Sequence, residues 1–174
     1  MTRLERRTME TLVVIELALE PGKIEVKTEY GMLDHFLNTL AKHAGWTLIF
    51  RAEGDRTEDK HHLTEDVAIA LGQAFGKALG ERKLARFGHA LVPMDEVLVR
   101  GAVDLADRAF FSSNMADPLF HHFMRSFAFA VPMTLHLDVL KQGEPHHETE
   151  ACFKTLALCL KQATRPAEEF PTVK

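Results

Sequence analysis

The sequence has 174 residues, of which 46% are hydrophobic and 26% charged, as in an ordinary globular protein. With 21 Lys and Arg against 25 Asp and Glu the formal net charge is −4, so the whole chain gives no electrostatic reason to bind nucleic acid or an anionic membrane. No apolar run approaches the roughly 20 residues of a membrane-spanning helix, and the charged N-terminal segment lacks the apolar core of a secretory signal.

The spacing of apolar residues in the first half predicts two strands, a helix, a third strand and a second helix. These elements are expected at residues 11–18, 23–28, 33–43, 46–52 and 61–79. Pro21-Gly22 lies between the first two strands and is a turn signal. We therefore expect these two strands to pair as a hairpin.

The second half restarts the same order of elements. Strands are expected at residues 96–105, 108–112 and 133–140, and helices at residues 119–129 and 146–163. Cys152 and Cys159 fall within the apolar pattern of the closing helix, which favours reduced, buried thiols over a disulfide framework. This cysteine usage predicts a cytoplasmic protein. The polar segment 166–174 contains two prolines and is expected to be irregular.

Two short motifs recur in both halves at near-constant offsets. A His-Phe segment begins at His35 and again at His122, and a His-His-x-x-Glu segment begins at His61 and again at His146. Such self-similarity is the signature of a duplicated unit. The predicted fold class is α+β, a tandem duplication of a ββαβα unit with two sheets, each packed on helices. We expect a first half at residues 1–88 and a second at 89–165, both within one compact domain.

The repeated histidines and glutamates are candidate metal ligands. Residues three or four apart share one face of a helix, so each doublet can present imidazoles beside a carboxylate, a donor set that suits divalent transition metals. The repeated positions supply eight candidates, four from each half: His35, His61, His62, Glu65, His122, His146, His147 and Glu150. Eight ligands divide into two metals with four each. Adjacent histidines on a helix point about 100° apart, so one doublet is expected to serve two metals, in different subunits.

Several segments together resemble one family, over nearly the whole chain. They are LDHFL from Leu33, HHLTEDVAIALGQA from His61, Arg86-Phe87-Gly88, Pro93-Met94-Asp95-Glu96, Thr134-Leu135-His136 and HHETEACFK from His146. This combination resembles imidazoleglycerol-phosphate dehydratase of histidine biosynthesis.

The resemblance implies a fold, a reaction and an assembly. The fold is two fused half-units of the ribosomal protein S5 domain 2 type. The reaction is a hydro-lyase step, loss of water from D-erythro-imidazole glycerol phosphate to give imidazole acetol phosphate. It would pass through a metal-stabilised imidazolate and a diazafulvene, with two Mn²⁺ per active site, although other divalent transition metals fit the same ligands. The assembly is a homo-oligomer, a shell of twenty-four subunits built from trimers with the metals between subunits. Its partner is a small-molecule phosphate.

Residue by residue, the resemblance implies that the eight repeated positions bind metal. It assigns catalytic roles to Glu10, His35, Glu65 and Glu150, and substrate binding to Glu10, Arg86, Arg108, Thr172 and Lys174. The two arginines and Lys174 would bind the phosphate, for which guanidinium and ammonium groups are suited. Met9-Glu10 and Met94-Asp95 also correspond in the repeat, which leaves open whether Asp95 shares the role of Glu10.

Two alternatives remain open at this stage: a sister lyase acting on another azole phosphate, and a metal-binding shell without catalytic activity. The chain also departs from the family pattern before the second doublet. There the family's Gly-x-Asn-x-His-His is shortened to Gly143-Glu144-Pro145-His146, which can move the start of the closing helix.

Overall fold

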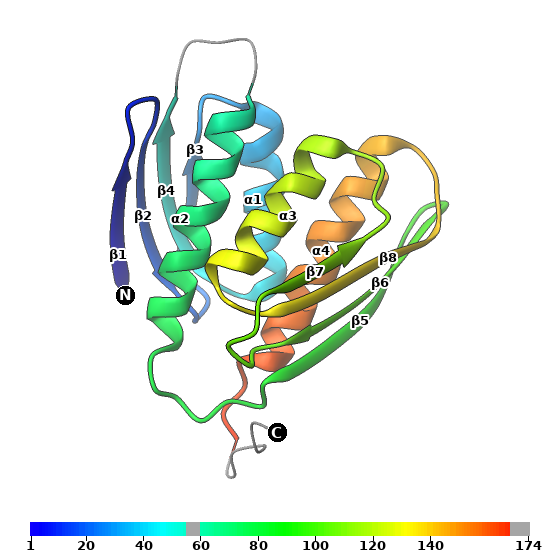
Figure 1. Ribbon diagram of the computed structural model, residues 1–174. Helices are drawn as coiled ribbons and strands as arrows, with labels where there is room; N and C mark the ends of the chain where they lie inside the picture. The colour runs from blue at the N-terminus through cyan, green and yellow to red at the C-terminus, as the bar shows by residue number, and fades with distance from the viewer. Residues whose placement is uncertain (55–59, 168–174) are drawn as a thin grey trace.

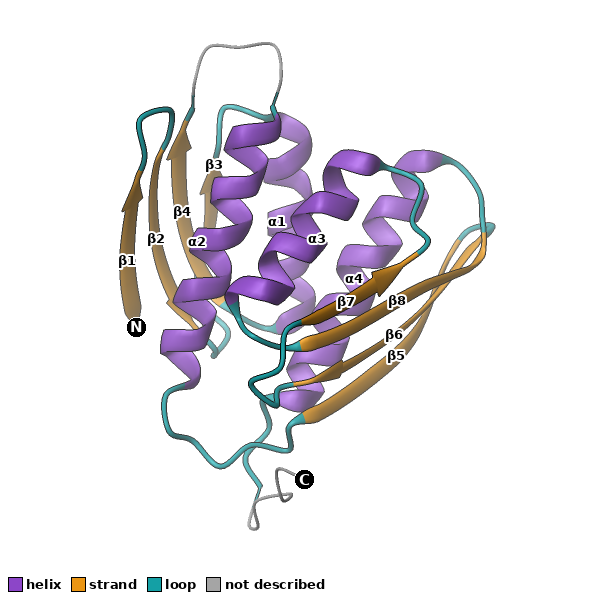
Figure 2. Cartoon of the chain, viewed as in Figure 1, coloured by secondary structure: helices purple, strands orange, loops and turns teal. Residues whose placement is uncertain are grey.

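The computed structural model describes residues 1–54 and 60–167. In this part of the chain two four-stranded sheets enclose a layer of helices (Figure 1 and Figure 2). The first half contributes β1 (Thr2–Arg7), β2 (Leu12–Ala18), β3 (Ile24–Lys27), α1 (Gly31–Ala44), β4 (Thr47–Glu53) and α2 (His61–Leu79). The second half contributes β5 (Phe87–Met94), β6 (Val97–Asp104), β7 (Phe110–Ser113), α3 (Pro118–Ala130), β8 (Thr134–Lys141) and α4 (Pro145–Ala163).

The two sheets have the same topology, with strand orders β1-β2-β4-β3 and β5-β6-β8-β7. The predicted α+β duplication is confirmed, and each ββαβα unit is preceded by one further strand, β1 or β5. The sequence pattern did not predict β1, because Leu4 is the one buried side chain of this strand. With charged residues on both sides of Leu4, too few apolar positions remain to show a period of two.

The predicted hairpin between the first two strands is wrong. In the structure β3 pairs with β4 in parallel, while β2 pairs antiparallel with β1 on one side and with β4 on the other. Val13, Ile15 and Leu17 are fully buried on β2, and both edges of this strand are occupied. Because β1 and β4 use every ladder position that β2 offers, β3 can join the sheet only at its outer edge. The Pro21-Gly22 turn therefore starts a crossover.

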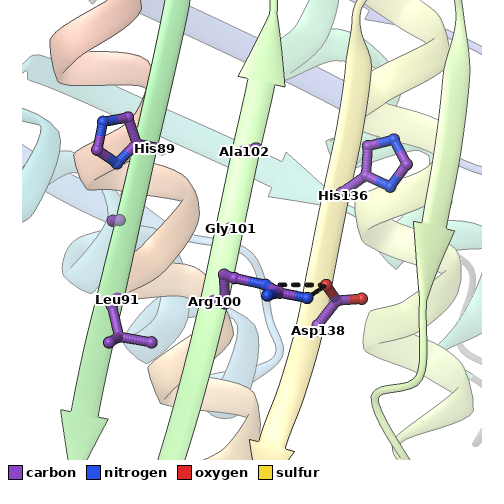
Figure 3. A pocket seen from close by; sticks show the side chains of 8 residues that line it. His89, Leu91, Arg100, Gly101, Ala102, His136 and Asp138 are labelled. Carbon is purple, nitrogen blue, oxygen red and sulfur yellow. Dashed lines mark hydrogen bonds and ion pairs between the residues drawn. The ribbon is translucent and has the colours of Figure 1, made fainter.

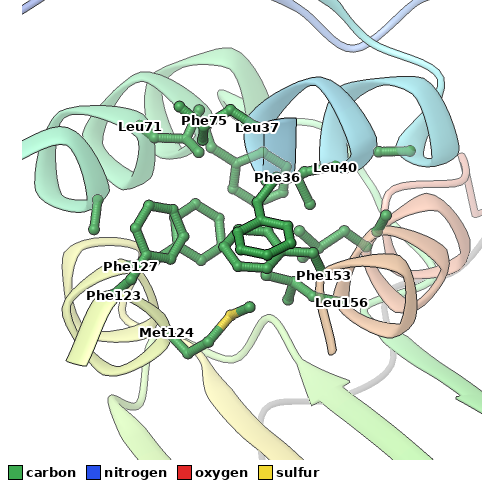
Figure 4. Close-up of a cluster of buried hydrophobic side chains, with 14 of the residues drawn as sticks. Phe36, Leu37, Leu40, Leu71, Phe75, Phe123, Met124, Phe127, Phe153 and Leu156 are labelled. Carbon is green, nitrogen blue, oxygen red and sulfur yellow. The ribbon is translucent and has the colours of Figure 1, made fainter. Parts of the chain in front are cut away.

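The helices of the two halves meet between the sheets. Helix α2 packs on α3 and α1 packs on α4, while α2 also covers β1 and β2, and α4 covers β5 and β6. A set of phenylalanines from all four helices fills the space between them (Figure 4). Phe36 stacks on Phe153 with ring centroids 5.1 Å apart, and Phe75 contacts Phe127 at 6.0 Å. One shared apolar core therefore fixes the two halves against each other.

Close approach of α2 and α3 depends on Gly72. A Cβ atom at this position would lie 2.6 Å from Cβ of Ala130 and 3.0 Å from the carbonyl oxygen of Phe127. Glycine lets the two helices approach this far, because a Cβ atom here would collide with the side chain of Ala130 and lie tightly against the backbone of α3.

Cys152 and Cys159 are buried in α4 and form no disulfide, which confirms the expectation of reduced, buried thiols. Burial raises the pKa of each thiol to about 12, so both stay protonated at neutral pH. A search of the described residues finds no helix with the length and apolarity that crossing a membrane requires.

Candidate metal and active site

The N-terminal ends of all four helices lie at the same end of the molecule (Figure 1). The predicted ligands are all close to these ends, in α1 and α2 of the first half and in α3 and α4 of the second. The start of α1 is tied to β3 because the Asp34 carboxylate accepts hydrogen bonds from Thr28, at 2.8 Å from the backbone nitrogen and 2.6 Å from Oγ1. The fold thus brings both histidine motifs of both halves to one face.

The first cluster consists of His35, His146 and Glu150. Oε2 of Glu150 lies 3.1 Å from Nε2 of His35 and 3.4 Å from Nε2 of His146. The two imidazole rings stack with centroids 5.2 Å apart and an interplanar angle of 22°. The three potential donor atoms all lie within 4.8 Å of one another.

The second cluster consists of His61, Glu65 and His122. Oε1 of Glu65 lies 3.1 Å from Nε2 of His122, and the rings of His61 and His122 stack with centroids 4.6 Å apart. Here too one donor atom from each residue lies within 4.8 Å of the others.

The internal duplication relates the two clusters, and each cluster combines residues from both halves of the chain. His35 of the first half joins the His-x-x-x-Glu pair of α4, and His122 of the second half joins the equivalent pair of α2. Two imidazoles and one carboxylate are a donor set for a divalent transition ion, and three protein ligands leave further coordination positions open. The residues therefore fit two equivalent metal ions, one on each cluster.

Glu150 is held as an anion. Burial raises its pKa, but hydrogen bonds from Lys154 and His35 outweigh burial, and the pKa lies below the ordinary value. Nζ of Lys154 is 3.0 Å from Oε1, which leaves Oε2 for the histidines. The sequence did not identify Lys154 as part of the site, although it follows Glu150 by four residues on α4 and therefore shares its face.

His62 and His147, the second members of the doublets, do not join the clusters. Each instead faces a carboxylate on the hairpin loop of its own half: Nδ1 of His62 lies 3.0 Å from Oε2 of Glu10, and Nδ1 of His147 lies 3.3 Å from Oε1 of Glu96. The structure therefore brings together six of the eight predicted ligands and points the other two elsewhere. Sequence reasoning missed Glu96, because the repeat had paired Glu10 with Asp95.

The loop that carries Glu10 is fastened to α2 by Asp66. This carboxylate is 8% exposed and accepts hydrogen bonds from Arg6 at 2.7 and 3.0 Å, from Thr8 at 3.2 Å and from Thr11. Oγ1 of Thr8 in turn accepts the backbone N–H groups of Glu10 and Thr11. Asp66 thus places Glu10 beside His62.

We expect Asp66→Asn to lower the free energy of unfolding by about 2–3 kcal/mol, because the amide leaves Arg6 without a buried anion and cannot accept all the present donors. Thermal unfolding should show a fall in Tm of roughly 5–10 °C. Asp138→Asn is the control, because Asp138 pairs with Arg100 on the surface, where ion pairs contribute little. Equal melting temperatures for both variants would contradict this account.

Arg86 and Arg108, the predicted phosphate ligands, lie together around Asp104. The guanidinium of Arg86 makes a bidentate contact to Asp104, and Nη2 of Arg108 is 3.6 Å from the same carboxylate. The hydrogen bonds that Arg86 donates to the Asp104 carboxylate raise the pKa of Arg86. Arg86 is buried and Arg108 is exposed. Thr172 and Lys174 lie outside the described residues.

The two arginines and the clusters lie at opposite ends of the helices. The backbone N–H of Arg86 donates to the carbonyl of Ala163 at the C-terminal end of α4, whereas His146 is at its N-terminal end. Since α4 has 19 residues, its ends are about 27 Å apart at 1.5 Å per residue. A single chain therefore cannot offer both groups to one small molecule.

The described residues also form a shallow pocket of about 250 Å³ on the outer face of the second sheet, lined by His89, Leu91, Arg100, His136 and Asp138 among others (Figure 3). Arg100 and Asp138 pair across it at 2.8 Å. None of the metal-ligand candidates lines this pocket. A depression of about 240 Å³ does adjoin the first cluster, where His146 lies beside Phe36 and Tyr30.

Comparisons with known proteins show the family of this chain. The sequence model of the imidazoleglycerol-phosphate dehydratase family matches residues 28–160. The enzyme of that name from Saccharomyces cerevisiae is 41% identical over 95% of this chain and 81% of the relative, and that from Granulibacter bethesdensis is 42% identical over 98% and 95%.

Solved structures give the same result. The crystal structure of imidazoleglycerol-phosphate dehydratase from Pyrococcus furiosus superposes with a TM-score of 0.86 at 32% identity, covering 97% of both chains. The Staphylococcus aureus structure gives 0.80 at 29% identity, covering 96% of this chain and all of the other. The family signature and the architecture thus agree over nearly the full length. The chain belongs to the imidazoleglycerol-phosphate dehydratase family, a family of hydro-lyases, as its histidine motifs predicted.

Proposed function

We propose that this protein dehydrates D-erythro-imidazole glycerol phosphate to imidazole acetol phosphate in histidine biosynthesis, as a cytoplasmic, metal-dependent hydro-lyase. The observation that carries the proposal is the pair of equivalent clusters, each with two imidazoles and one carboxylate whose donor atoms lie within 4.8 Å. Family membership supplies the substrate, and the donor chemistry supports the dependence on metal.

The first cluster would hold one divalent ion and the second cluster another, with Mn²⁺ the expected metal from the family resemblance. His62 and His147 would complete the ligand sets of a neighbouring copy, because in this chain they belong to neither cluster. When bound, the two ions supply Lewis-acid stabilisation of negative charge on the imidazole ring of the substrate.

The chain's own groups would orient the substrate and move its protons. Dehydration removes the hydroxyl on the carbon attached to the ring and a hydrogen from the next carbon, and the resulting enol becomes the ketone. Glu10 is the proposed general acid and base, acting through its carboxylate oxygens. It is half exposed and already placed beside His62, so it can reach a substrate in the same region.

The phosphate would be bound by Arg86 and Arg108 of another copy of the chain. The substrate spans about 10 Å from ring to phosphate at ordinary bond lengths, much less than the length of α4 that separates Arg86 from His146. A site shared between copies resolves this mismatch and supports a homo-oligomer. We propose the trimer-based shell of twenty-four subunits that the family resemblance implies, with Thr172 and Lys174 as further phosphate ligands.

The decisive experiment follows the conversion of imidazole glycerol phosphate by the purified protein, first stripped with a chelator and then supplied with Mn²⁺. We expect no imidazole acetol phosphate from the stripped protein and steady turnover after the metal is restored. Full metal binding without turnover would favour a non-catalytic shell. Failure to complement a histidine auxotroph that lacks the dehydratase, despite turnover of other azole phosphates, would favour a sister lyase.

A further inference from the structure

We propose that Glu96 is a positioning residue that holds His147 by its Nδ1 and so directs Nε2 away from the hairpin, and that Gly143 makes this arrangement possible. The inference deepens the proposed function, since it rests on His147 serving a metal ion of a neighbouring copy. It concerns the shortened loop before α4, which differs from the family pattern.

Glu96 connects the β5–β6 hairpin to the beginning of α4. Its Oε1 accepts the backbone N–H of Glu144 at 2.7 Å and lies 3.3 Å from Nδ1 of His147, whose distance to Oε2 is 3.4 Å. Glu144 is the N-cap of α4, and its carboxylate accepts the backbone N–H of His147 at 3.0 Å. The backbone and the ring of His147 are therefore held by two different carboxylates.

Gly143 leaves the space that Glu96 occupies. A Cβ atom at this position would lie 2.3 Å from Oε1, 2.4 Å from Cγ and 2.6 Å from Cδ of Glu96. No side chain can be accommodated without moving the carboxylate. The close approach of the loop to Glu96 thus depends on glycine.

Asp95 and Glu96 are neighbours on the β5–β6 hairpin, but only Glu96 lies within hydrogen-bond distance of His147. Oδ2 of Asp95 lies 3.8 Å from Nδ1 of His147, beyond hydrogen-bond distance, and the Asp95 side chain is 72% exposed against 46% for Glu96. Oε1 of Glu96 also accepts the backbone N–H of Glu144 at 2.7 Å, and this contact holds the carboxylate beside the ring of His147. Glu96, and not Asp95, therefore corresponds in its contact to Glu10.

An acceptor at Nδ1 selects the ring tautomer. An ionised carboxylate can only accept, so Nδ1 of His147 carries the hydrogen, and in the neutral ring Nε2 then keeps its lone pair. Carboxylates that fix metal-binding histidines in this way raise the basicity of the ligand and set its direction. The first half shows the same contact, because Glu10 lies 3.0 Å from Nδ1 of His62. The two halves reach this contact through different loops, which makes chance proximity a poor explanation.

The test uses the full-length assembly with four variants. Glu96→Ala removes the acceptor and Gly143→Ala displaces it, and both should weaken Mn²⁺ binding about 10- to 100-fold in calorimetry. Glu96→Gln keeps an acceptor oxygen and should restore affinity to within a few-fold of the unmodified protein. Asp95→Ala, the matched control one residue away, should leave affinity unchanged.

The second readout is independent of turnover. Solid-state ¹⁵N NMR of metal-free protein with labelled histidine, assigned by difference from a His147→Asn variant, should show His147 protonated at Nδ1. The signal should shift toward the Nε2-protonated tautomer in Glu96→Ala and Gly143→Ala. An unchanged tautomer in both variants would overturn the inference, whatever happens to affinity. If the tautomer shifts while the unmodified protein fails to dehydrate imidazole glycerol phosphate, the proposed function falls and the inference stands.

Discussion

Glu150→Gln is expected to abolish dehydration together with metal binding at the first cluster. Oε2 of Glu150 is within 3.4 Å of both cluster histidines, and it supplies the one negative charge among the three donors. An amide in its place is a weak ligand for a divalent ion. Changes to residues that hydrogen-bond to metal ligands typically lower metal affinity about 10- to 100-fold. Loss of a ligand itself should therefore lower metal affinity at least about 100-fold, and turnover should fall in parallel.

Metal analysis of size-fractionated protein and steady-state kinetics at fixed Mn²⁺ check this prediction. Glu65→Gln, the equivalent change in the second cluster, should behave in the same way because the duplication makes the two clusters equivalent. Glu53→Gln is the control for the same chemical change at an exposed position on β4 and should leave both quantities unchanged. A Glu150→Gln protein with full metal content and normal turnover would remove the basis of the proposed site.

Two variants with impaired activity, Arg86→Ala and Glu150→Gln, are expected to regain activity when they assemble together. Arg86→Ala should raise the substrate KM and leave metal content intact, because Arg86 is about one helix length from the clusters. Glu150→Gln, by contrast, should lose the metal ion of the first cluster and keep both arginines. If a site draws its metal cluster and its arginine from different chains, random co-assembly of equal amounts should return about a quarter of the sites.

The measurement is kcat/KM of co-refolded or co-expressed mixtures, with each variant alone as the baseline. Arg108→Ala can replace Arg86→Ala if loss of the buried Arg86–Asp104 pair destabilises the fold, since Arg108 is exposed. A mixture of Glu150→Gln with Glu65→Gln tests whether kcat/KM also recovers when both changes lie in the metal clusters and the arginines of both chains are unchanged. Activity of the Arg86 mixture equal to the sum of the separate variants would show that one chain supplies both groups.

Sequence periodicity predicted the elements whose apolar positions are regular and failed where they are sparse. Helix α2 was expected at residues 61–79 and spans His61–Leu79, because its buried face repeats at the helical period. Strand β1 was not predicted because it buries one side chain. The pairing of β3 with β4 was also missed, since a turn signal reports local backbone geometry and carries no information about which strand edge is free.

The candidate site shows the same division. The motifs around His35, His61, His122 and His146 identified the ligand types, because helix geometry determines which residues of one motif share a face. The choice of Glu96 over Asp95 as the partner of His147 could not be predicted, because adjacent residues differ in direction and the loop that selects between them is brought in by β8 and α4.

The amino-acid sequence by itself determined the family, the duplication and the chemistry of the donors, since all three depend on residue identity and on spacing along the chain. Only the tertiary structure decided that each cluster combines one histidine of one half with the His-x-x-x-Glu pair of the other. It also decided that the arginines lie at the far end of the helices. These relations depend on how the two halves pack through their shared core, because contacts between segments distant in sequence form only when the helices pack together.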